Sequence, residues 1–319
     1  MRGKWTFTPS ETCSIPNIAS WEISNRKDQT YLLQVSWPLG WASEKPSTSA
    51  NFLYVCHGLT KRSANGPRYL VDGNAVFFSA TDTVRRRQAR NLHEPGTIVV
   101  GIGYPLHDSV YSPRRAFDLT PPTEHYVPPA GPDGQPRAQP HGGADQLLVF
   151  ITEVVRPFLA STVFPGVRVS RTALFGHSYG GLFVLHTLFT QPMLFDAYLA
   201  ASPSIWWNDG FILSEEAAFC RTADTDTDTD TSHRPALRLS YGSREQYPVR
   251  QRDELPEQFE QRKRGAALRR MTDNCCEMYA RLRGSGRLHV EKREYVDEDH
   301  GSVIAPALSG GILYFLDLE

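Results

Sequence analysis

Short apolar runs alternate along the chain with segments of helical periodicity. The segment "GGADQLLVFITEVVRPFL" repeats apolar residues every three or four positions, and "GGLFVLHTLFTQPMLF" is apolar enough to be a buried helix. Strands that alternate with helices predict an α/β fold with a mainly parallel central sheet, right-handed crossovers and helices on both faces. The strand-like runs, most of which end in Gly, Pro or Ser, are "QTYLLQVSWP", "NFLYV", "TIVVGIGYP", "TALFG", "DAYLAASPS" and "LRLSYGS".

Size, charge and cysteine content narrow the class of protein. A chain of 319 residues with 40% hydrophobic residues predicts one α/β domain over residues 1–319. The net charge of -1 argues against a nucleic-acid or anionic membrane partner. With no signal-like N-terminus and no run of 18 apolar residues, we expect a cytoplasmic protein without a membrane span. The five cysteines lack CxxC spacing, so we expect reduced structural thiols and neither a metal site nor a disulfide framework.

Three segments do not follow the alternation of strands and helices. Residues 56–68, "CHGLTKRSANGPR", interrupt what would otherwise be a strand leading into a turn. Within residues 222–235, Asp-Thr repeats from Asp224 to Thr231 with four close negative charges and no apolar residue, which predicts a solvated acidic low-complexity loop. Residues 244–270 are rich in arginine, but interspersed glutamates favour a solvated amphipathic helix over an anion-binding surface.

The stretch "LFGHSYGGLFVLH" contains the pattern G-x-S-x-G centred on Ser178. In a nucleophile elbow, a strand ends in a sharp turn that exposes the serine oxygen, and a helix follows. Here "TALF" supplies the strand and "GLFVLHTLF" the helix, so we predict that Ser178 is a nucleophile. The alternative is a glycine-rich turn with a helix-capping serine.

A serine hydroxyl needs a base, and this kind of elbow is followed along the chain by an acid and then a histidine. His300, in the polar loop "VDEDHGSVIAPAL" between a strand-like run and the C-terminal helix, is our candidate base. Glu245 follows "LRLSY" and the Gly242 turn, and is our candidate acid, which would fix the histidine tautomer. Four other carboxylates compete for that role, namely Asp253, Asp297, Glu298 and Asp299.

The oxyanion hole should combine two backbone N–H groups. One belongs to Tyr179, which follows the nucleophile, and the other comes from a loop after an early strand. The segment "YLVDGNAVF" supplies that loop, with Asn74 or a neighbour as the donor. A plain hairpin turn at "DGN" is the alternative.

Seven segments resemble, in the same order, the putative esterase family of α/β-hydrolases, which includes siderophore esterases. They are "YLVDGNA", "VVGIGYP", "RRAFDLTPP", "HGGADQLLVFITEVVRPFL", "LFGHSYGGLFVLHTLFTQPMLFDAYLAASPSIWW", "YGSREQ" and "DEDHGSVIAPAL". The resemblance implies an α/β-hydrolase fold and places Ser178, Glu245 and His300 at the family's triad positions. This sequence differs from the family pattern at residues 56–68, which lie between a strand and the "DGN" turn. They are either a loop over the pocket or an incorrectly included segment such as a translated intron.

The resemblance also implies residues that line the substrate site. Arg115 and Asp118 match such a segment, and Trp206 with Trp207 follows the "ASPS" turn beside it. An aromatic and basic wall would suit a bulky polar ester or an anionic iron–siderophore complex, whereas core packing is the alternative for the two tryptophans.

The sequence therefore predicts a cofactor-free serine esterase that acts on a small-molecule ester through an acyl-enzyme, and the resemblance implies a siderophore or a similar polar ester as the substrate. Two alternatives stay open. One is a thioesterase, acyltransferase or ester hydrolase of a secondary-metabolite pathway, because the triad dictates chemistry and the pocket walls dictate the substrate. The other is a binding protein that has kept the fold and lost catalysis.

Overall fold

The computed structural model describes residues 15–25, 29–41, 49–56, 73–91, 93–106, 112–131, 135–223 and 234–318. The atypical segment 56–68 therefore lies outside the described residues except for Cys56. Most of the acidic loop predicted at 222–235 also lies outside them, and residues 222 and 223 belong to a helix.

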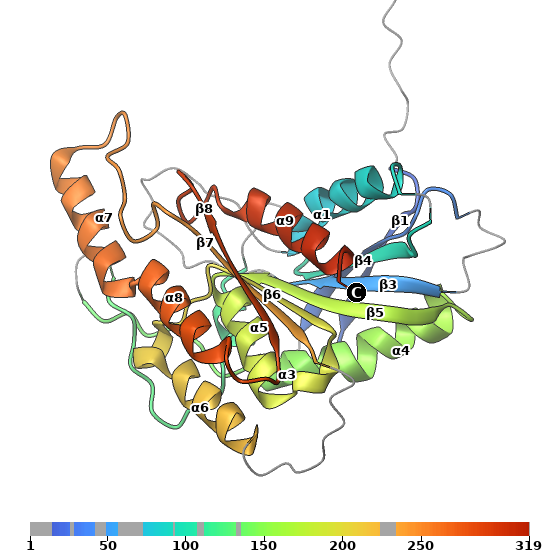
Figure 1. The fold of residues 1–319 in the computed structure, drawn as a ribbon, viewed down its shortest axis with the longest axis horizontal. Coiled ribbons are helices and arrows are strands. Elements are labelled where there is room, and N and C mark those ends of the chain that lie inside the picture. Colours follow the sequence, from blue (N-terminus) through green and yellow to red (C-terminus); the bar gives the residue numbers. More distant parts are fainter. Residues whose placement is uncertain are drawn as a thin grey trace, which may run out of the picture.

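A single eight-stranded sheet, in the order β1-β2-β4-β3-β5-β6-β7-β8, forms the centre of the molecule (Figure 1). All pairs from β4 to β8 in that order are parallel, whereas β1 and β2 join one edge in antiparallel fashion. The predicted mainly parallel sheet is thus confirmed, and β1 is a strand that the apolar runs did not indicate. The strands are β1 (Ile18–Ser24), β2 (Thr30–Ser36), β3 (Ser49–Val55), β4 (Gly96–Gly103), β5 (Arg168–His177), β6 (Ala197–Ala201), β7 (Ala236–Gly242) and β8 (His289–Tyr295).

The central strands are apolar on both faces because helices cover both. Along β3, Phe52 and Tyr54 belong to one buried cluster and Leu53 and Val55 to the other. This alternation follows from the two-residue period of a strand. It explains why these strands read as continuous apolar runs in the sequence.

Helices α1 (Gly73–Gln88) and α9 (Ile304–Leu316) cover one face of the sheet (Figure 1). The other face is covered by a long helical run at residues 144–163 and by α5, α6 and α8. Helix α7 stands out beyond the β7–β8 edge, and its mostly exposed side chains agree with the predicted solvated helix. The remaining helices are α2 (Arg115–Asp118), α3 (Ala144–Val149), α4 (Arg156–Phe158), α5 (Tyr179–Thr190), α6 (Ile212–Ala223), α7 (Pro256–Arg269) and α8 (Met271–Leu282).

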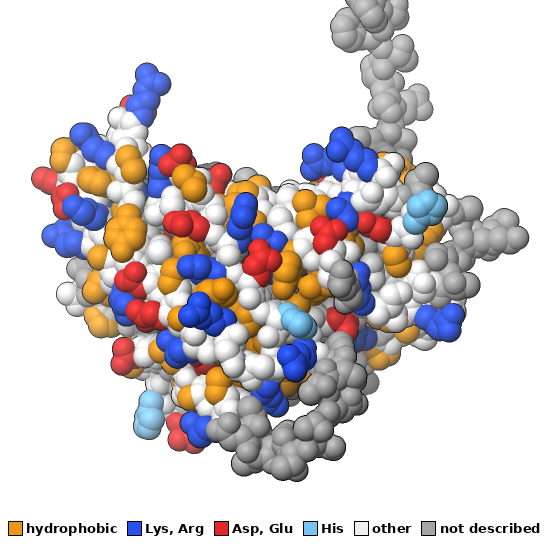
Figure 2. All heavy atoms as spheres, in the orientation of Figure 1, with side chains coloured by type: hydrophobic (Ala, Val, Ile, Leu, Met, Phe, Trp, Pro, Cys, Tyr) orange, Lys and Arg blue, Asp and Glu red, His pale blue; other side chains and the backbone are white. Residues whose placement is uncertain are grey.

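The helical run at residues 144–163 is the one described helix long and apolar enough to cross a membrane by length and composition. One of its faces is buried in the cluster that contains Phe52 and Tyr54, while Asp145 and Glu153 are exposed. This division is the pattern of an amphipathic helix that covers a sheet. Basic and acidic side chains are interspersed on the face of the molecule drawn in Figure 2.

The backbone at Ser178 joins β5 to α5 in an unusual conformation. Its φ of 59° and ψ of -116° are rare for a residue with a side chain. A Cβ atom at Gly176 would lie 2.1 Å from the carbonyl oxygen of Gly180, so the turn closes only with glycine at that position. The spacing of the G-x-S-x-G pattern is thus explained by a backbone contact.

His186 connects three helices beneath the sheet. From α5, it bonds through Nδ1 to Glu215 of α6 and through Nε2 to Asp145 of α3, both at 2.9 Å. Burial of the imidazole disfavours its charge, but the two carboxylates outweigh that effect and raise the pKa of His186.

We expect His186→Gln to destabilise the protein by about 2 kcal/mol at pH 6, because Glu215 would lose its buried cation. The folded-state pKa lies above the unfolded value of about 6.5, so the stabilisation is complete below that value and is lost as pH rises through the folded pKa. Urea unfolding at pH 6 and pH 9 should therefore show a smaller difference from wild type at pH 9. The exposed His289→Gln is the control, and an equal or larger loss at pH 9 would contradict this account.

Gly176→Ala should cost at least about 3 kcal/mol, because the added methyl group meets backbone atoms that cannot move aside. Gly265→Ala in α7 is the matched control. Nothing lies within 4 Å of its added Cβ, so it should gain up to about 1 kcal/mol of helix stability. Thermal unfolding of the two variants measures this contrast, and an unchanged midpoint for Gly176→Ala would refute the close contact.

Candidate active site

Ser178, His300 and Glu245 form one chain of hydrogen bonds. His300 Nε2 lies 3.0 Å from Ser178 Oγ, and His300 Nδ1 lies 2.5 Å from Glu245 Oε2. The side chain of Glu245 is fully buried, whereas that of His300 is 35% exposed. The histidine can therefore meet a substrate or a water molecule from outside, while its carboxylate partner is shielded from solvent.

The second oxygen of Glu245 is fixed by two donors. Ser202 Oγ donates to Oε1 at 2.5 Å, and the Gly242 N–H donates to the same atom at 2.7 Å. Ser202 follows β6 with a φ of 43°, and Gly242 ends β7. Two neighbouring strand ends thus hold the carboxylate, and Ser202 is a supporting residue that the sequence did not single out.

The other acidic residues near His300 shape its loop. Asp299 Oδ1 accepts hydrogen bonds from the backbone N–H groups of Gly301 and Ser302. Asp297 forms an ion pair with Arg244 at 2.8 Å. The carbonyl of Glu298 accepts from the Arg244 N–H at 3.0 Å. Asp253 lies in an exposed segment after β7.

The two predicted oxyanion donors both lie at helix starts. Tyr179 is the first residue of α5, so its N–H has no acceptor within the helix. Gly73 is the first residue of α1 and Asn74 the second, so these two residues of the predicted loop belong to a helix, while Asp72 lies outside the described residues. Helix N-termini carry partial positive charge, which favours an anionic oxygen nearby.

Ser204 is a further polar neighbour of Ser178. Its Oγ lies 3.3 Å from Ser178 Oγ, and its N–H donates to the Ser178 carbonyl at 3.1 Å. Ser204 is fully buried in the turn after β6. The "ASPS" motif therefore supplies both Ser202, which contacts Glu245, and Ser204, which contacts Ser178.

Arg115 and Asp118, on the short helix α2, differ in their surroundings. The guanidinium carbon of Arg115 lies 6.0 Å from the centre of the ring of Tyr179, the residue that follows Ser178. Asp118 is buried and accepts from Tyr104 OH at 2.9 Å, with Arg114 Nε 3.1 Å away. Burial raises the pKa of Asp118, and the Arg114 cation opposes that shift. Asp118 thus anchors the segment that carries Arg115.

Trp206 and Trp207 are adjacent in sequence but lie in different environments. Trp207 is 1% exposed and packs in an aromatic cluster with Tyr126, His141 and Phe211. Trp206 is partly exposed, and its ring centre lies 6.3 Å from that of Tyr179. Trp207 is therefore a core residue, as the alternative from the sequence proposed. Trp206 instead lies next to Tyr179, the residue that follows Ser178.

Arg269, which was not among the site residues predicted from the sequence, lies beside Trp206. The guanidinium carbon of Arg269, at the end of α7, lies 5.5 Å from the centre of the Trp206 ring. Burial raises the pKa of the Tyr179 phenol, and the charges of Arg115 and Arg269 oppose that shift. The arginine-rich composition of residues 244–270 was the available signal, but it did not distinguish Arg269 from its exposed neighbours.

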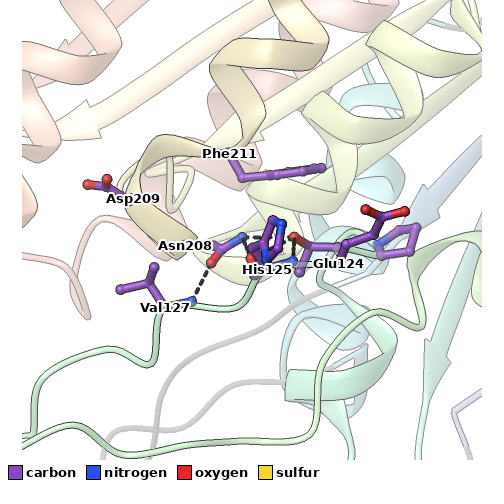
Figure 3. Close-up of a pocket in the computed structure, with 8 residues that line it drawn as sticks. Glu124, His125, Val127, Asn208, Asp209 and Phe211 are labelled. Atoms are coloured by element: carbon purple, nitrogen blue, oxygen red, sulfur yellow. Dashed lines mark hydrogen bonds between the residues drawn. The ribbon is translucent and has the colours of Figure 1, made fainter.

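A surface groove lies beside Trp207 and is lined by residues of two connections (Figure 3). Asn208, with φ of 50° and ψ of 52°, accepts from the Val127 N–H at 2.6 Å and donates to the His125 carbonyl at 3.0 Å. These bonds tie the connection after β6 to the chain that follows α2. None of Ser178, Glu245 and His300 lines this groove.

Comparisons with known proteins agree with this architecture. The profile of the family described as putative esterase matches residues 24–284. The siderophore enterobactin esterase of Emericella nidulans is 55% identical over 99% of this chain and 99% of its own length. The siderophore triacetylfusarinine C esterase of Aspergillus fumigatus is 43% identical, with coverage of 95% and 94%.

Among solved structures, siderophore hydrolase EstA from Aspergillus nidulans superimposes with a TM-score of 0.88 and 53% identity, over 99% of both chains. This likeness confirms the α/β-hydrolase fold expected from the sequence. The chain belongs to the putative esterase family.

Proposed function

We propose that this protein hydrolyses the ester bonds of a siderophore through an acyl-enzyme formed on Ser178. The observation that carries the proposal is the hydrogen-bonded chain from Ser178 Oγ through His300 to Glu245. In the first step, His300 Nε2 takes the Ser178 proton while Oγ attacks the ester carbonyl. His300 then gives that proton to the leaving alcohol, and a water molecule activated by His300 releases the acyl group.

Glu245 serves this cycle by holding the histidine. Its Oε2 faces Nδ1, so the N–H of the neutral imidazole is fixed on that side and Nε2 is left to accept the serine proton. When His300 becomes charged, the buried carboxylate stabilises the imidazolium. The bonds from Ser202 and Gly242 keep Glu245 in position throughout.

The oxyanion of the tetrahedral intermediate would be held by the Tyr179 N–H and by an N–H at the start of α1, near Asn74. Both helix starts favour negative charge, and removing one such donor typically costs about 3 kcal/mol of barrier. This arrangement gives α1 and α5 a direct part in the reaction.

Two observations support a siderophore as the substrate. The close relatives are named as esterases of enterobactin and of triacetylfusarinine C, and both align over nearly the whole chain. Trp206 is partly exposed and has the Arg269 guanidinium carbon 5.5 Å from its ring centre, whereas the adjoining Tyr179 and Arg115 are buried. A partly exposed ring beside a cation favours an anionic, ring-bearing chelate through stacking and charge. A cytoplasmic location stays a prediction from the sequence.

Ser178→Ala should abolish turnover of both p-nitrophenyl acetate and a siderophore ester, with a fall in kcat of at least about 10⁵. The reason is that, in the described part of the chain, the hydroxyl bonded to His300 Nε2 is that of Ser178. Wild type and the exposed Ser161→Ala should react with a fluorophosphonate probe, whereas Ser178→Ala should not. Unchanged turnover in Ser178→Ala would refute the mechanism, and a folded wild-type protein that ignores the probe would favour a binding role.

Arg269→Met should raise KM for an anionic siderophore ester by about tenfold, because it removes a cation beside Trp206 and keeps the apolar stem. The KM for the neutral p-nitrophenyl acetate should change much less. Arg264→Met, at an exposed position on the same helix, is the matched control for loss of charge. Equal losses for the neutral and anionic esters would exclude charge recognition by Arg269.

A further inference from the structure

The sulfur atom of Cys276 lies within hydrogen-bond distance of a lysine ammonium and a tyrosine hydroxyl. Lys292 Nζ, from β8, donates to Cys276 Sγ on α8 at 3.1 Å, and Tyr241 OH lies 3.2 Å from the same sulfur. The Lys292 ammonium also lies 5.6 Å from the centre of the Tyr279 ring. Neither Cys276 nor Lys292 takes part in the proposed hydrolysis.

These surroundings favour a reactive thiol at Cys276. The thiolate is the nucleophilic form of cysteine, and a nearby ammonium and hydroxyl donor stabilise its charge. Cys276 is partly exposed, whereas its neighbour Cys275 is fully buried. Burial, with a further contribution from Glu245, raises the pKa of the Cys275 thiol well above its ordinary value. Burial likewise raises the pKa of Cys56 to about 12.

We propose that Cys276 is a peroxide-reactive site, and that its oxidation to a sulfenic acid lowers the esterase activity. In this step the sulfur attacks one oxygen of hydrogen peroxide, an S–O bond forms and the O–O bond breaks. The sulfur loses two electrons, the peroxide is reduced, and the thiol proton joins the departing hydroxide to give water. The products are one sulfenic acid and one water molecule, and the Lys292 ammonium stabilises both the attacking sulfur and the departing hydroxide.

The site is coupled to Glu245 through the backbone. Tyr241 is 2% exposed and immediately precedes Gly242, whose N–H holds Glu245 Oε1 at 2.7 Å. We expect an oxygen atom added to Cys276 Sγ to displace the two groups that contact the sulfur, Lys292 Nζ and Tyr241 OH, and so to move the Tyr241 ring. Because the ring is tightly packed, the displacement is passed to the Gly242 turn and to the carboxylate that it positions.

Labelling of the intact protein tests the first half of the proposal. Peroxide-treated protein is quenched with a sulfenic-acid probe, and the modified cysteines are mapped by mass spectrometry over time. Cys220, which is also partly exposed, is the reference within the chain. We expect Cys276 to react at least about tenfold faster than Cys220, and Lys292→Met to remove that advantage.

Lys263→Met, an exposed lysine on α7, is the control for loss of a positive charge and should leave the ratio unchanged. The reaction rate of Cys220 in each variant reports whether the fold is intact. Equal rates at the two cysteines of the wild type, or equal effects of the two lysine variants, would overturn the proposal.

Hydrolysis of p-nitrophenyl acetate tests the second half. Peroxide should lower the activity of the wild type severalfold, a thiol reductant should restore it, and Cys276→Ser should keep its own activity under the same treatment. Inhibition that persists in Cys276→Ser would overturn the coupling to Glu245. The labelling experiment needs no esterase activity, so a failure of the proposed function and a failure of the peroxide site are distinguishable.

Discussion

The conformation of Ser178 is the constraint on which the candidate active site depends. A non-glycine residue at this φ and ψ costs about 1 to 3 kcal/mol, and the surrounding backbone holds it there. The Ser178 N–H donates to the Ala201 carbonyl at 3.0 Å, and the Ser178 carbonyl accepts from Leu182 and Ser204. The position of Oγ is therefore set by β6 and α5, and the serine has little freedom of its own.

Glu245 and His300 are also held together by backbone contacts. A Cβ atom at Gly242 would lie 2.3 Å from the Glu298 carbonyl oxygen, so the turn after β7 and the loop after β8 touch through their backbones. Arg244 joins them again by its bond to Glu298 and its ion pair with Asp297. Glu245 and His300 consequently belong to one rigid unit, and α8 packs beneath it against β7 and β8.

The sequence predicted what is local or fixed by chain order. The elbow could be read because strand, serine and helix are contiguous, and His300 could be selected because it follows the elbow in a polar loop. Long-range packing decided the rest. Trp206 and Trp207 are neighbours in sequence, yet only Trp207 enters the buried aromatic cluster. Arg269 is the last residue of α7, which ends at Arg270 in a left-handed backbone conformation, and its guanidinium carbon lies 5.5 Å from the centre of the Trp206 ring. The hydrophobic periodicity of the sequence does not reveal this contact.

Strand order also has a consequence for the synthesis of the chain. His300 follows β8, which lies at the edge of the sheet beside β7, whereas the Ser178 turn follows the central strand β5 and contacts β6. The serine turn can thus be assembled from segments that leave the ribosome early, but His300, its hydrogen-bond partner, arrives only after β8. A growing chain would therefore carry the Ser178 turn without that partner until this edge of the sheet is complete.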